Sequence, residues 1–349
     1  MAGKVETPTG NQGEPRQQPE QKILFKANSQ KNAECQDIVG AAIRAIKNGL
    51  SVIPTDPASK KPALKKWRPY QTTPMSQEHA LKFDWPGMAI LSGNVSGNLE
   101  VLDFDYQAEW FKPWAEIVER EAPGLVDRLL HQKTQSGGKH VVYRCPGVEV
   151  PGNAKLAADK VEVDGSGEQL FKGKKHEAHQ DGDRWFIFPC YIETRGEGGY
   201  FLAAPTPGYA LEGGSLFDLP EITPAEREIL IKSATALNLY VKPKYHKQPT
   251  VDGTRPGDCY NEQADPRPLM EKHGWTLAGS RGEFEHYTRP GKRAGISASL
   301  IEGKLFHVFS SNAPPLEQWT VYTPFALYAT LEYGGDFEAA ARELRRQGY

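Results

Sequence analysis

One short segment constrains the fold more than any other: residues 99–107 read Leu-Glu-Val-Leu-Asp-Phe-Asp-Tyr-Gln. The apolar run predicts a strand that enters a hydrophobic core. Since residues two apart on a strand point to the same face, Asp103 and Asp105 project together and Phe104 points into the core. Two carboxylates this close repel each other unless a cation lies between them. The segment therefore predicts either a divalent metal site, with oxygen ligands suited to Mg²⁺ or Mn²⁺, or a strand end whose acids reach solvent.

Length and composition are those of a globular protein with two domains. The chain has 349 residues, of which 38% are hydrophobic and 25% charged, and this length exceeds one typical domain. Its 42 basic and 44 acidic residues leave a net charge of −2, so any nucleic-acid binding must depend on local basic patches. No apolar run reaches transmembrane length, and the polar N-terminus lacks the apolar core of a signal peptide.

The cysteine pattern argues against a disulfide framework and against a cysteine-rich zinc site. Cys35, Cys145, Cys190 and Cys259 lie far apart, and none forms a CxxC pair. We therefore expect a cytoplasmic protein with free thiols and no membrane partner.

The chain divides into four expected parts. Residues 1–30, rich in Gln, Pro, Gly and Glu, predict a disordered tail. A main domain is expected over 31–220, a helix and linker over 221–253, and a small accessory domain over 254–349. The predicted helices are residues 38–48, 107–121, 223–238 and 261–273, followed by two at the C-terminus. The predicted strands lie within 50–56, 87–93, 98–105, 131–145, 191–205, 275–279, 283–289, 295–300 and 304–309, with hairpins at 131–145 and 191–205.

Two further segments carry residues suited to phosphate and metal. The turn Ser136-Gly137-Gly138-Lys139-His140 lies between two predicted strands, and its glycines can expose backbone N–H groups as an anion nest. An ordinary hairpin turn is the other interpretation, since Gly-Gly is common there. Glu193 lies inside an apolar strand with Arg195 on the same face. It predicts either a metal ligand or an internal pair with Arg195.

These segments, in this order, resemble the three motifs of the archaeo-eukaryotic primase superfamily, in its prim-pol branch of phage and plasmid replication proteins. The motifs are DFD at 103–105, SGGKH at 136–140 and the Glu193 strand, and the resemblance covers about residues 33–215. It implies an α+β fold, with an RRM-like catalytic sheet and a flanking α/β unit over the main domain, 31–220. Many relatives have Asp at the third motif, so Asp164 competes with Glu193. Glu193 is preferred because its segment is strand-like, whereas Asp164 precedes a glycine as turn residues do.

The resemblance also implies an activity and residue roles. The activity is template-directed primer synthesis and extension by a DNA-directed nucleotidyltransferase. Asp103, Asp105 and Glu193 would hold two divalent ions, Mg²⁺ or Mn²⁺, which lower the pKa of the primer 3′-hydroxyl and neutralise the leaving pyrophosphate. The residues implied at the nucleotide are Ser136, Gly137, Gly138, Lys139, His140 and Arg195. The implied partners are a single-stranded DNA template, dNTPs or NTPs, and a replicative helicase, in the host cytoplasm.

Several other residues are weighed between function and packing. The loop at 60–68 predicts template contacts through Lys60, Lys61, Lys65, Lys66, Trp67 and Arg68; a solvated loop anchored by Trp67 is the other interpretation. Tyr106 is expected to pack, with sensing of the sugar 2′ position as the alternative. The polar insert at 165–184, with His176 and His179, is expected to be solvated rather than metal-binding.

The last hundred residues loosely resemble the zinc ribbon of bacterial-type primases, but no cysteine stands near His286 or at 309–312. We expect a ribbon-like unit without zinc, held by apolar contacts. The expected core residues are Leu277, Phe284, Ile296, Leu305, Phe306, Val308, Phe309, Phe325, Leu327 and Leu331. The residues expected to position template are Arg281, Arg289, Lys292 and Arg293. No Walker A sequence occurs, so the sequence contains no helicase motor.

Two other functions compete with a primase-polymerase. One is a catalytically idle module of the same fold that recognises a replication origin, against which the intact motifs argue. The other is a metal-dependent DxD glycosyltransferase, which needs neither the glycine turn nor the later acidic strand. A phosphatase of the haloacid-dehalogenase type is disfavoured because Gln107 stands where that family needs threonine.

Overall fold

The structure is a computed structural model that describes residues 38–241 and 255–349. The expected tail at 1–30 and the linker segment at 242–254 lie outside these residues, and the predicted boundaries at 220 and 254 stay predictions. Helices alternate with antiparallel sheets, which confirms the predicted α+β class. Among the described helices, none combines the length and apolar character needed to cross a membrane.

The N-terminal lobe is built around a three-stranded sheet of order β1-β2-β13. Its strands are β1 (Val52–Pro54), β2 (Met88–Leu91) and β13 (Tyr200–Ala203). A helix described over 38–47 packs its alanine-rich face on the sheet, and Gly49, at φ +73°, follows its end, as glycine commonly does. Two short helices, η1 (Arg68–Gln71) and α2 (Gln77–Ala80), complete the lobe.

The central sheet has six strands in the order β14-β4-β5-β3-β12-β6, and neighbouring strands are antiparallel. The strands are β3 (Leu99–Phe104), β4 (Leu130–Lys133), β5 (Lys139–Arg144), β6 (Lys155–Ala158), β12 (Cys190–Arg195) and β14 (Ala210–Leu211). The predicted hairpin between β4 and β5 is confirmed.

The predicted hairpin at 191–205 is wrong, because β12 and β13 lie in different sheets. The chain crosses from the central sheet to the N-terminal lobe through 196–199. The earlier crossing from β2 to β3, through η2 (Asn94–Ser96), lies beside it. Glu197 ties the two crossings together, since its carboxylate accepts the backbone N–H of Asn94 at 2.7 Å. This contact holds the two crossings side by side.

Helices cover one face of the central sheet. They are α3 (Phe111–Glu121), preceded by the turn η3 (Tyr106–Ala108), then α4 (Leu125–Arg128) and α5 (Pro224–Thr235). Trp114 of α3 packs against Phe104 of β3, with ring centroids 5.1 Å apart, in a large apolar cluster. Thr223 and Glu226 form a capping box that starts α5.

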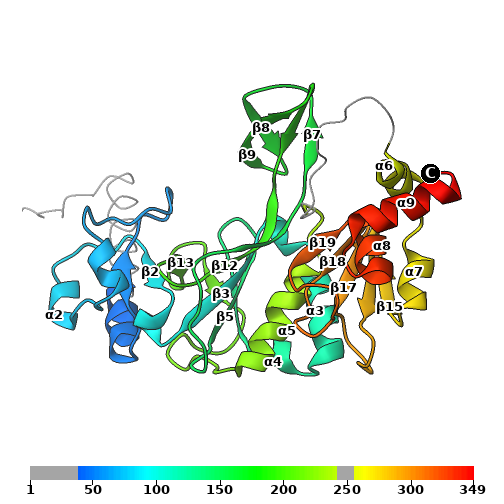
Figure 1. Cartoon of the computed structure of the whole chain (residues 1–349). Coiled ribbons are helices and arrows are strands. Elements are labelled where there is room, and N and C mark those ends of the chain that lie inside the picture. The colour runs from blue at the N-terminus through cyan, green and yellow to red at the C-terminus, as the bar shows by residue number, and fades with distance from the viewer. Residues whose placement is uncertain (1–37, 242–254) are drawn as a thin grey trace, which may run out of the picture.

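An arm of short strands projects from the central sheet (Figure 1). Its strands are β7 (Val161–Val163), β8 (Glu168–Phe171), β9 (Lys174–Glu177), β10 (His179–Asp181) and β11 (Arg184–Ile187). They form a β10-β11-β7 sheet and a β8-β9 hairpin. The polar insert is thus folded into strands, and most of its side chains are exposed, as expected of a solvated insert. The arm has few buried residues, among them Ala178, Phe186 and Ile187, and for this reason its composition is that of a loop.

The C-terminal unit is a five-stranded antiparallel sheet of sequential strands with four helices packed around it. The strands are β15 (Thr276–Arg281), β16 (Phe284–Thr288), β17 (Ala298–Ile301), β18 (Leu305–Val308) and β19 (Thr320–Tyr322). The helices are α6 (Pro256–Gln263), α7 (Arg267–Lys272), α8 (Pro324–Tyr333) and α9 (Phe337–Gln347). One helix was expected over 261–273, but the chain breaks it before Pro266. Leu277, expected in the core, is 59% exposed because it lies on edge strand β15.

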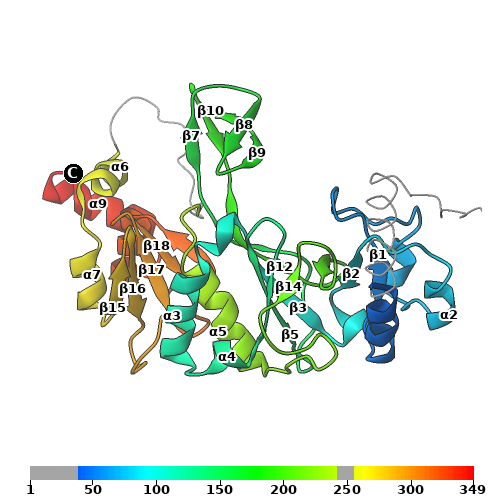
Figure 2. The ribbon, with the colours of Figure 1, turned by 180° about the vertical axis from the view of Figure 1, so that it is seen from behind.

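The C-terminal unit packs behind the central sheet, so that α3 and α5 lie between the two sheets (Figure 2). Ile296 and Phe309 join the apolar cluster that contains the residues of α3 and α5. Arg281 forms an ion pair with Glu116 at 2.6 Å, and Lys292 pairs with Glu121 at 3.2 Å. Both cations, which were expected to position template, therefore connect the unit to α3.

Candidate active site

A row of polar side chains crosses the face of the central sheet that the helices leave open. His140 of β5 stands opposite Asp103 of β3, and Asp103 stands opposite Glu193 of β12. Gln132 of β4 and Lys155 of β6 extend the row at its two ends. Directly opposite residues of antiparallel strands share a face and lie close together. The register therefore brings the three predicted motifs side by side, although they are far apart in the sequence.

The acids at the end of β3 alternate as the sequence predicts. Phe104 is fully buried on the helix side, while Asp103 and Asp105 both line a pocket on the other side. Arg195 bridges two acids, with its guanidinium 3.0 Å from Asp103 and 2.5 Å from Glu193. Asp105 pairs with Lys174 of the arm at 2.5 Å. Each of the three acids therefore has a cationic partner.

The surroundings shift the pKa of two carboxyls in opposite directions. Burial alone would raise the pKa of Asp103, but His140 and Arg195 hold it well below its usual range. Burial raises the pKa of Glu193; Arg195 lowers it, and the charges of Asp103 and Asp105 raise it further. Glu193 is therefore the acid whose ionised form most needs a cation.

His140 is oriented by a residue that was not predicted. Gln132 is fully buried; its Oε1 accepts the N–H of Ala204 at 2.8 Å, and its Nε2 donates to the carbonyl of Leu202 at 2.9 Å. These two contacts fix the amide, so Nε2 is also the donor to Nδ1 of His140, at 2.9 Å. A neutral His140 then carries its proton on Nε2, which lies 3.5 Å from Asp103. The ring can donate this N–H into the pocket.

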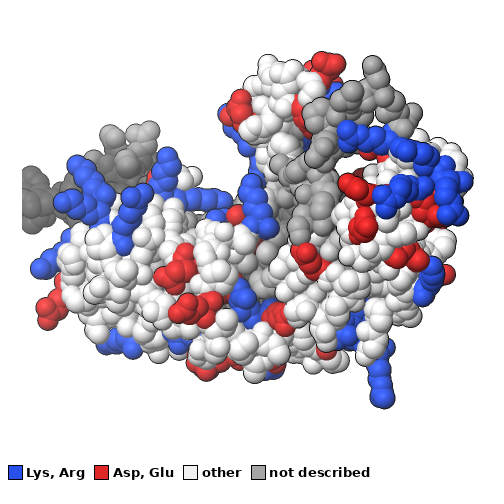
Figure 3. Space-filling model, in the orientation of Figure 1, with Lys and Arg blue, Asp and Glu red and all other residues white. Residues whose placement is uncertain are grey.

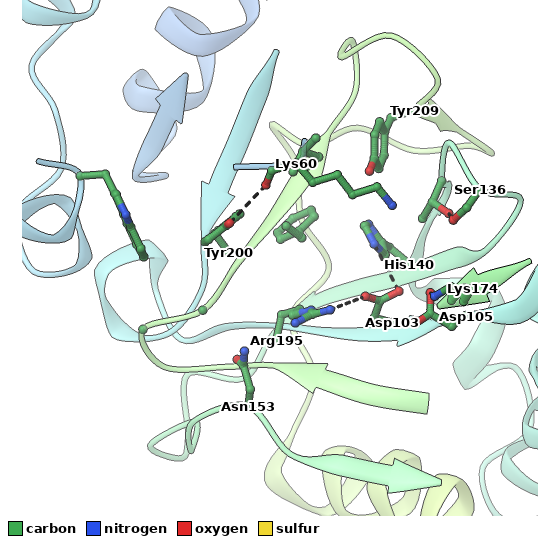
Figure 4. Close-up of a pocket in the computed structure, with 16 residues that line it drawn as sticks. Lys60, Asp103, Asp105, Ser136, His140, Asn153, Lys174, Arg195, Tyr200 and Tyr209 are labelled. Atoms are coloured by element: carbon green, nitrogen blue, oxygen red, sulfur yellow. Dashed lines mark hydrogen bonds and ion pairs between the residues drawn. The ribbon is translucent and has the colours of Figure 1, made fainter. Parts of the chain in front are cut away.

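A pocket of about 350 Å³ opens above this row (Figure 4). It lies between the central sheet and the N-terminal lobe, with the arm at one side. Its lining residues are Lys60, Trp67, Asp103, Asp105, Thr134, Ser136, His140, Asn153, Lys174, Arg195, Gly198, Gly199, Tyr200, Phe201, Leu202 and Tyr209. Of the predicted nucleotide-binding residues, it thus contains Ser136, His140 and Arg195.

The other residues of the glycine turn have structural roles. A Cβ on Gly137 would lie 2.1 Å from Oε1 of Gln107, and one on Gly138 would lie 2.4 Å from the carbonyl oxygen of Phe104. The turn therefore needs glycine to pack against the end of β3. Lys139 points away from the pocket, where it pairs with Glu212 at 2.5 Å and lies over the ring of Phe111.

The segment after Asp105 has an unusual backbone. Tyr106, Gln107 and Ala108 have φ angles of +52°, +60° and +53°, a region that costs free energy for residues other than glycine. Gln107 donates to the carbonyl of Ser136 at 2.8 Å, and the Tyr106 hydroxyl lies 2.7 Å from Nε2 of His176. The glycine turn and the arm thus hold this turn from two sides. Tyr106 is buried and does not line the pocket, as the packing interpretation predicts.

The basic loop of the N-terminal lobe contributes two residues to the pocket, Lys60 and Trp67. The ring of Trp67 meets Tyr200 edge-on at 5.4 Å, and Tyr200 also donates to the carbonyl of Lys60 at 3.2 Å. The remaining predicted residues, Lys61, Lys65, Lys66 and Arg68, are exposed outside the pocket. Figure 3 shows basic side chains along the upper edge of this lobe, on the side toward which the arm projects.

Two predicted alternatives concern residues of the arm. Neither Asp164 nor Glu193 lines the pocket, but Glu193 stands opposite Asp103 and pairs with Arg195, which does line it. Asp164, the competing third acid, is exposed on the arm. Lys174, which does line it, was missed because nothing in the polar insert distinguishes this lysine from its neighbours. His176 contacts Tyr106, whereas His179 is exposed.

The acids suit divalent ions in chemistry, since three carboxylates offer the oxygen ligands that Mg²⁺ and Mn²⁺ prefer. Within 38–241 and 255–349, however, no three His, Cys, Asp or Glu side chains already form a metal-binding group. Arg195 and Lys174 supply the counter-charge instead. Ion binding at this site therefore requires these cations to give up their carboxylates.

Comparison with known proteins agrees with the fold and the motifs. No curated protein matches the chain. The family model described as bifunctional DNA primase/polymerase, N-terminal, matches residues 42–221, which contain the sheet of the N-terminal lobe, the central sheet, the arm and the whole pocket. The chain therefore belongs to the Prim-Pol family.

Proposed function

We propose that this protein is a DNA primase-polymerase that synthesises and extends primers on a single-stranded DNA template in phage or plasmid replication. The observation that carries the proposal is the side-by-side placement of His140, Asp103 and Glu193 on three neighbouring strands, where Asp103, Asp105 and His140 line one pocket. Two-metal nucleotidyl transfer needs acids and phosphate-binding donors in this kind of arrangement.

In the proposed reaction the three acids would hold the metal ions and the remaining side chains would hold the nucleotide. Two divalent ions, when bound, would activate the primer 3′-hydroxyl and neutralise the leaving pyrophosphate. His140 donates its Nε2–H to a phosphate oxygen, and Arg195, freed from the carboxylates, offers the triphosphate a second donor. The hydroxyl of Ser136 provides a third polar contact at the pocket wall.

The basic loop is proposed to guide the template. Lys60 extends into the pocket and has no ion-pair partner among the described residues (Figure 4). Trp67 offers an aromatic surface, and the exposed cations beside it can follow a phosphate backbone. A replicative helicase as partner and a location in the host cytoplasm stay predictions drawn from the family alone.

An incorporation assay with matched variants tests the proposal. The wild-type protein, Mg²⁺ or Mn²⁺, a single-stranded template and labelled nucleotides should give primer extension and primers made without a starter. Glu193→Gln and Asp103→Asn should each reduce the rate by at least about a hundredfold. Each removes a carboxylate that would hold a divalent ion, and the charge of that ion stabilises the transition state. Asp164→Asn is the control and should retain the wild-type rate.

Three outcomes would contradict the assignment. An active Glu193→Gln with an inactive Asp164→Asn would move the third acid to the arm. A wild-type protein that binds template without incorporating nucleotides would favour the idle origin-binding module. Transfer of a sugar from a nucleotide-sugar, with no incorporation, would favour the glycosyltransferase.

A further inference from the structure

The arm brings a lysine into the pocket from outside the family motifs. Lys174 opens strand β9, and its ammonium lies 2.5 Å from the Asp105 carboxylate. It lines the same pocket as Ser136 and His140 and remains 35% exposed. Figure 4 shows it beside Asp105, on the opposite side of Asp103 from Arg195. A group that arrives in the pocket can therefore reach Lys174.

The position of Lys174 is fixed by several contacts of the same hairpin. His176, two residues later on the same face, lies 2.7 Å from the Tyr106 hydroxyl, and the ring of Phe171 meets Tyr106 edge-on at 6.0 Å. Lys172 contacts both carboxylate oxygens of Glu109, at 2.6 and 2.9 Å. The hairpin thus grips the segment that follows Asp105. Lys174 is held at the pocket by this grip rather than by a chance surface contact.

Charge balance indicates what happens to Lys174 when ligands arrive. Asp103, Asp105 and Glu193 lie among four cations, Arg195, Lys174, Lys155 and Lys60. Divalent ions on the carboxylates would leave Lys174 without its partner and beside another cation, which is repulsive. A triphosphate carries the negative charge that restores the balance and accepts hydrogen bonds from an ammonium.

We propose that Lys174 is a nucleotide-binding residue which the arm delivers, and that it exchanges Asp105 for the phosphates of a nucleoside triphosphate when divalent ions bind. The inference rests on the proposed function of the pocket. It gives the arm a direct part in nucleotide binding. It also makes Lys174 a competitor of the divalent ion before the nucleotide arrives.

The exchange predicts two effects of opposite sign for Lys174→Met. Mn²⁺ alone, titrated without nucleotide, should bind several-fold more tightly, because no lysine competes for Asp105. An α,β-imido dNTP, added with Mg²⁺ and without template, should bind about tenfold more weakly, which is the loss of one charge-assisted hydrogen bond. The corresponding deoxynucleoside monophosphate should bind as it does to the wild type.

Lys175→Met is the matched control. Lys175 is the next residue of the same strand, pairs with Glu168, and is 73% exposed. Its removal changes the charge of the hairpin equally but should alter neither titration. Lys174→Arg keeps the charge and should retain most of the affinity for the triphosphate. If Lys174→Arg also loses this affinity, the loss in Lys174→Met reflects a displaced hairpin rather than the missing charge.

The proposal is overturned if Lys174→Met and Lys175→Met give the same affinities, or if Lys174→Met weakens triphosphate and monophosphate equally. Neither titration needs turnover, so they are independent of polymerase activity. A wild-type protein that binds the imido nucleotide while Lys174→Met binds it equally well would refute the role of Lys174 and leave the proposed function standing. A wild-type protein that binds no nucleotide would refute both.

Discussion

The carboxylates on the two faces of strand β3 differ in the number and kind of their hydrogen-bond and ion-pair partners. On the helix side, Glu100 is fully buried and receives two hydrogen bonds from Arg227, at 2.6 and 2.8 Å, and a third from Tyr143 at 2.8 Å. On the pocket side, Asp103 and Glu193 share one guanidinium, and Asp105 depends on a lysine of the arm. Glu100 is saturated by partners of the framework, whereas the pocket acids have partners that other ligands can replace.

The comparison shows how one residue type can serve structure and chemistry within a single strand. A buried carboxylate with a complete set of fixed partners contributes to a unique packing arrangement. A carboxylate whose counter-charge is shared and partly exposed can exchange that counter-charge for a metal ion. The number and mobility of the partners differ between the two faces, and these decide the role.

The largest expected effect lies on the helix side. Arg227→Met leaves the Glu100 carboxylate buried with only Tyr143 as a partner, and loss of one member of such a pair costs about 3–5 kcal/mol. The free energy of unfolding, measured by urea denaturation, should fall by this amount. Surviving folded protein should still bind nucleotide, since Arg227 is remote from the pocket. A variant as stable as the wild type would mean that the ion pair of Arg227 with Glu100 does not stabilise the fold.

A smaller effect of opposite sign is expected on the pocket side. The raised pKa of Glu193 means that folding disfavours its ionised form, so Glu193→Gln should raise the free energy of unfolding by about 1 kcal/mol at neutral pH. The same denaturation experiment measures it. The gain should disappear in acid, below the pKa of the unfolded carboxyl, where Glu193 is protonated in both states. A destabilised variant would place Glu193 with Glu100 among the structural acids.

The smallest effect concerns pH. Because burial raises the pKa of Glu193 above 4.5, its carboxylate becomes protonated as the pH falls through that raised value. Mn²⁺ affinity should therefore decline at a higher pH than an ordinary glutamate would allow. Asp103, whose pKa is held low, should remain ionised throughout this range. A titration of Mn²⁺ affinity between about pH 5 and pH 8 checks this, with Glu193→Gln as the variant that lacks the transition.

Much of the candidate site follows from strand alternation and motif order. Asp103, Asp105, His140 and Glu193 were placed on strands or at their ends, and the structure brings them together. Alternation also explains why Lys139 does not line the pocket that His140 lines, because two consecutive strand residues cannot both face one pocket. Lys174 could not be found in this way, since its place depends on how the arm folds back onto Tyr106.

The sheet arrangement was less accessible from the sequence. Local patterns located β12 and β13, but the crossing between them is held by a contact of Glu197 with Asn94, residues about a hundred positions apart. In the C-terminal unit, Phe306 and Val308 were correctly placed in a core. An apolar pattern alone does not reveal that Ile296 and Phe309 pack against helices of the other sheet rather than within their own unit.

The apolar cluster shared by α3, α5 and the C-terminal unit limits how the chain can be dissected. Ile296 and Phe309 are covered by residues of the main domain, and they cover those residues in turn. A truncated chain without 255–349 would expose this surface to water, so a loss of priming would not distinguish a missing template contact from a damaged catalytic sheet. Single substitutions of Arg289 and Arg293 are a better test of template positioning by this unit, because neither residue belongs to that cluster. Where residues of two parts share one apolar cluster, a deletion of one part also changes the folding of the other, so its effect cannot be assigned to the deleted part alone.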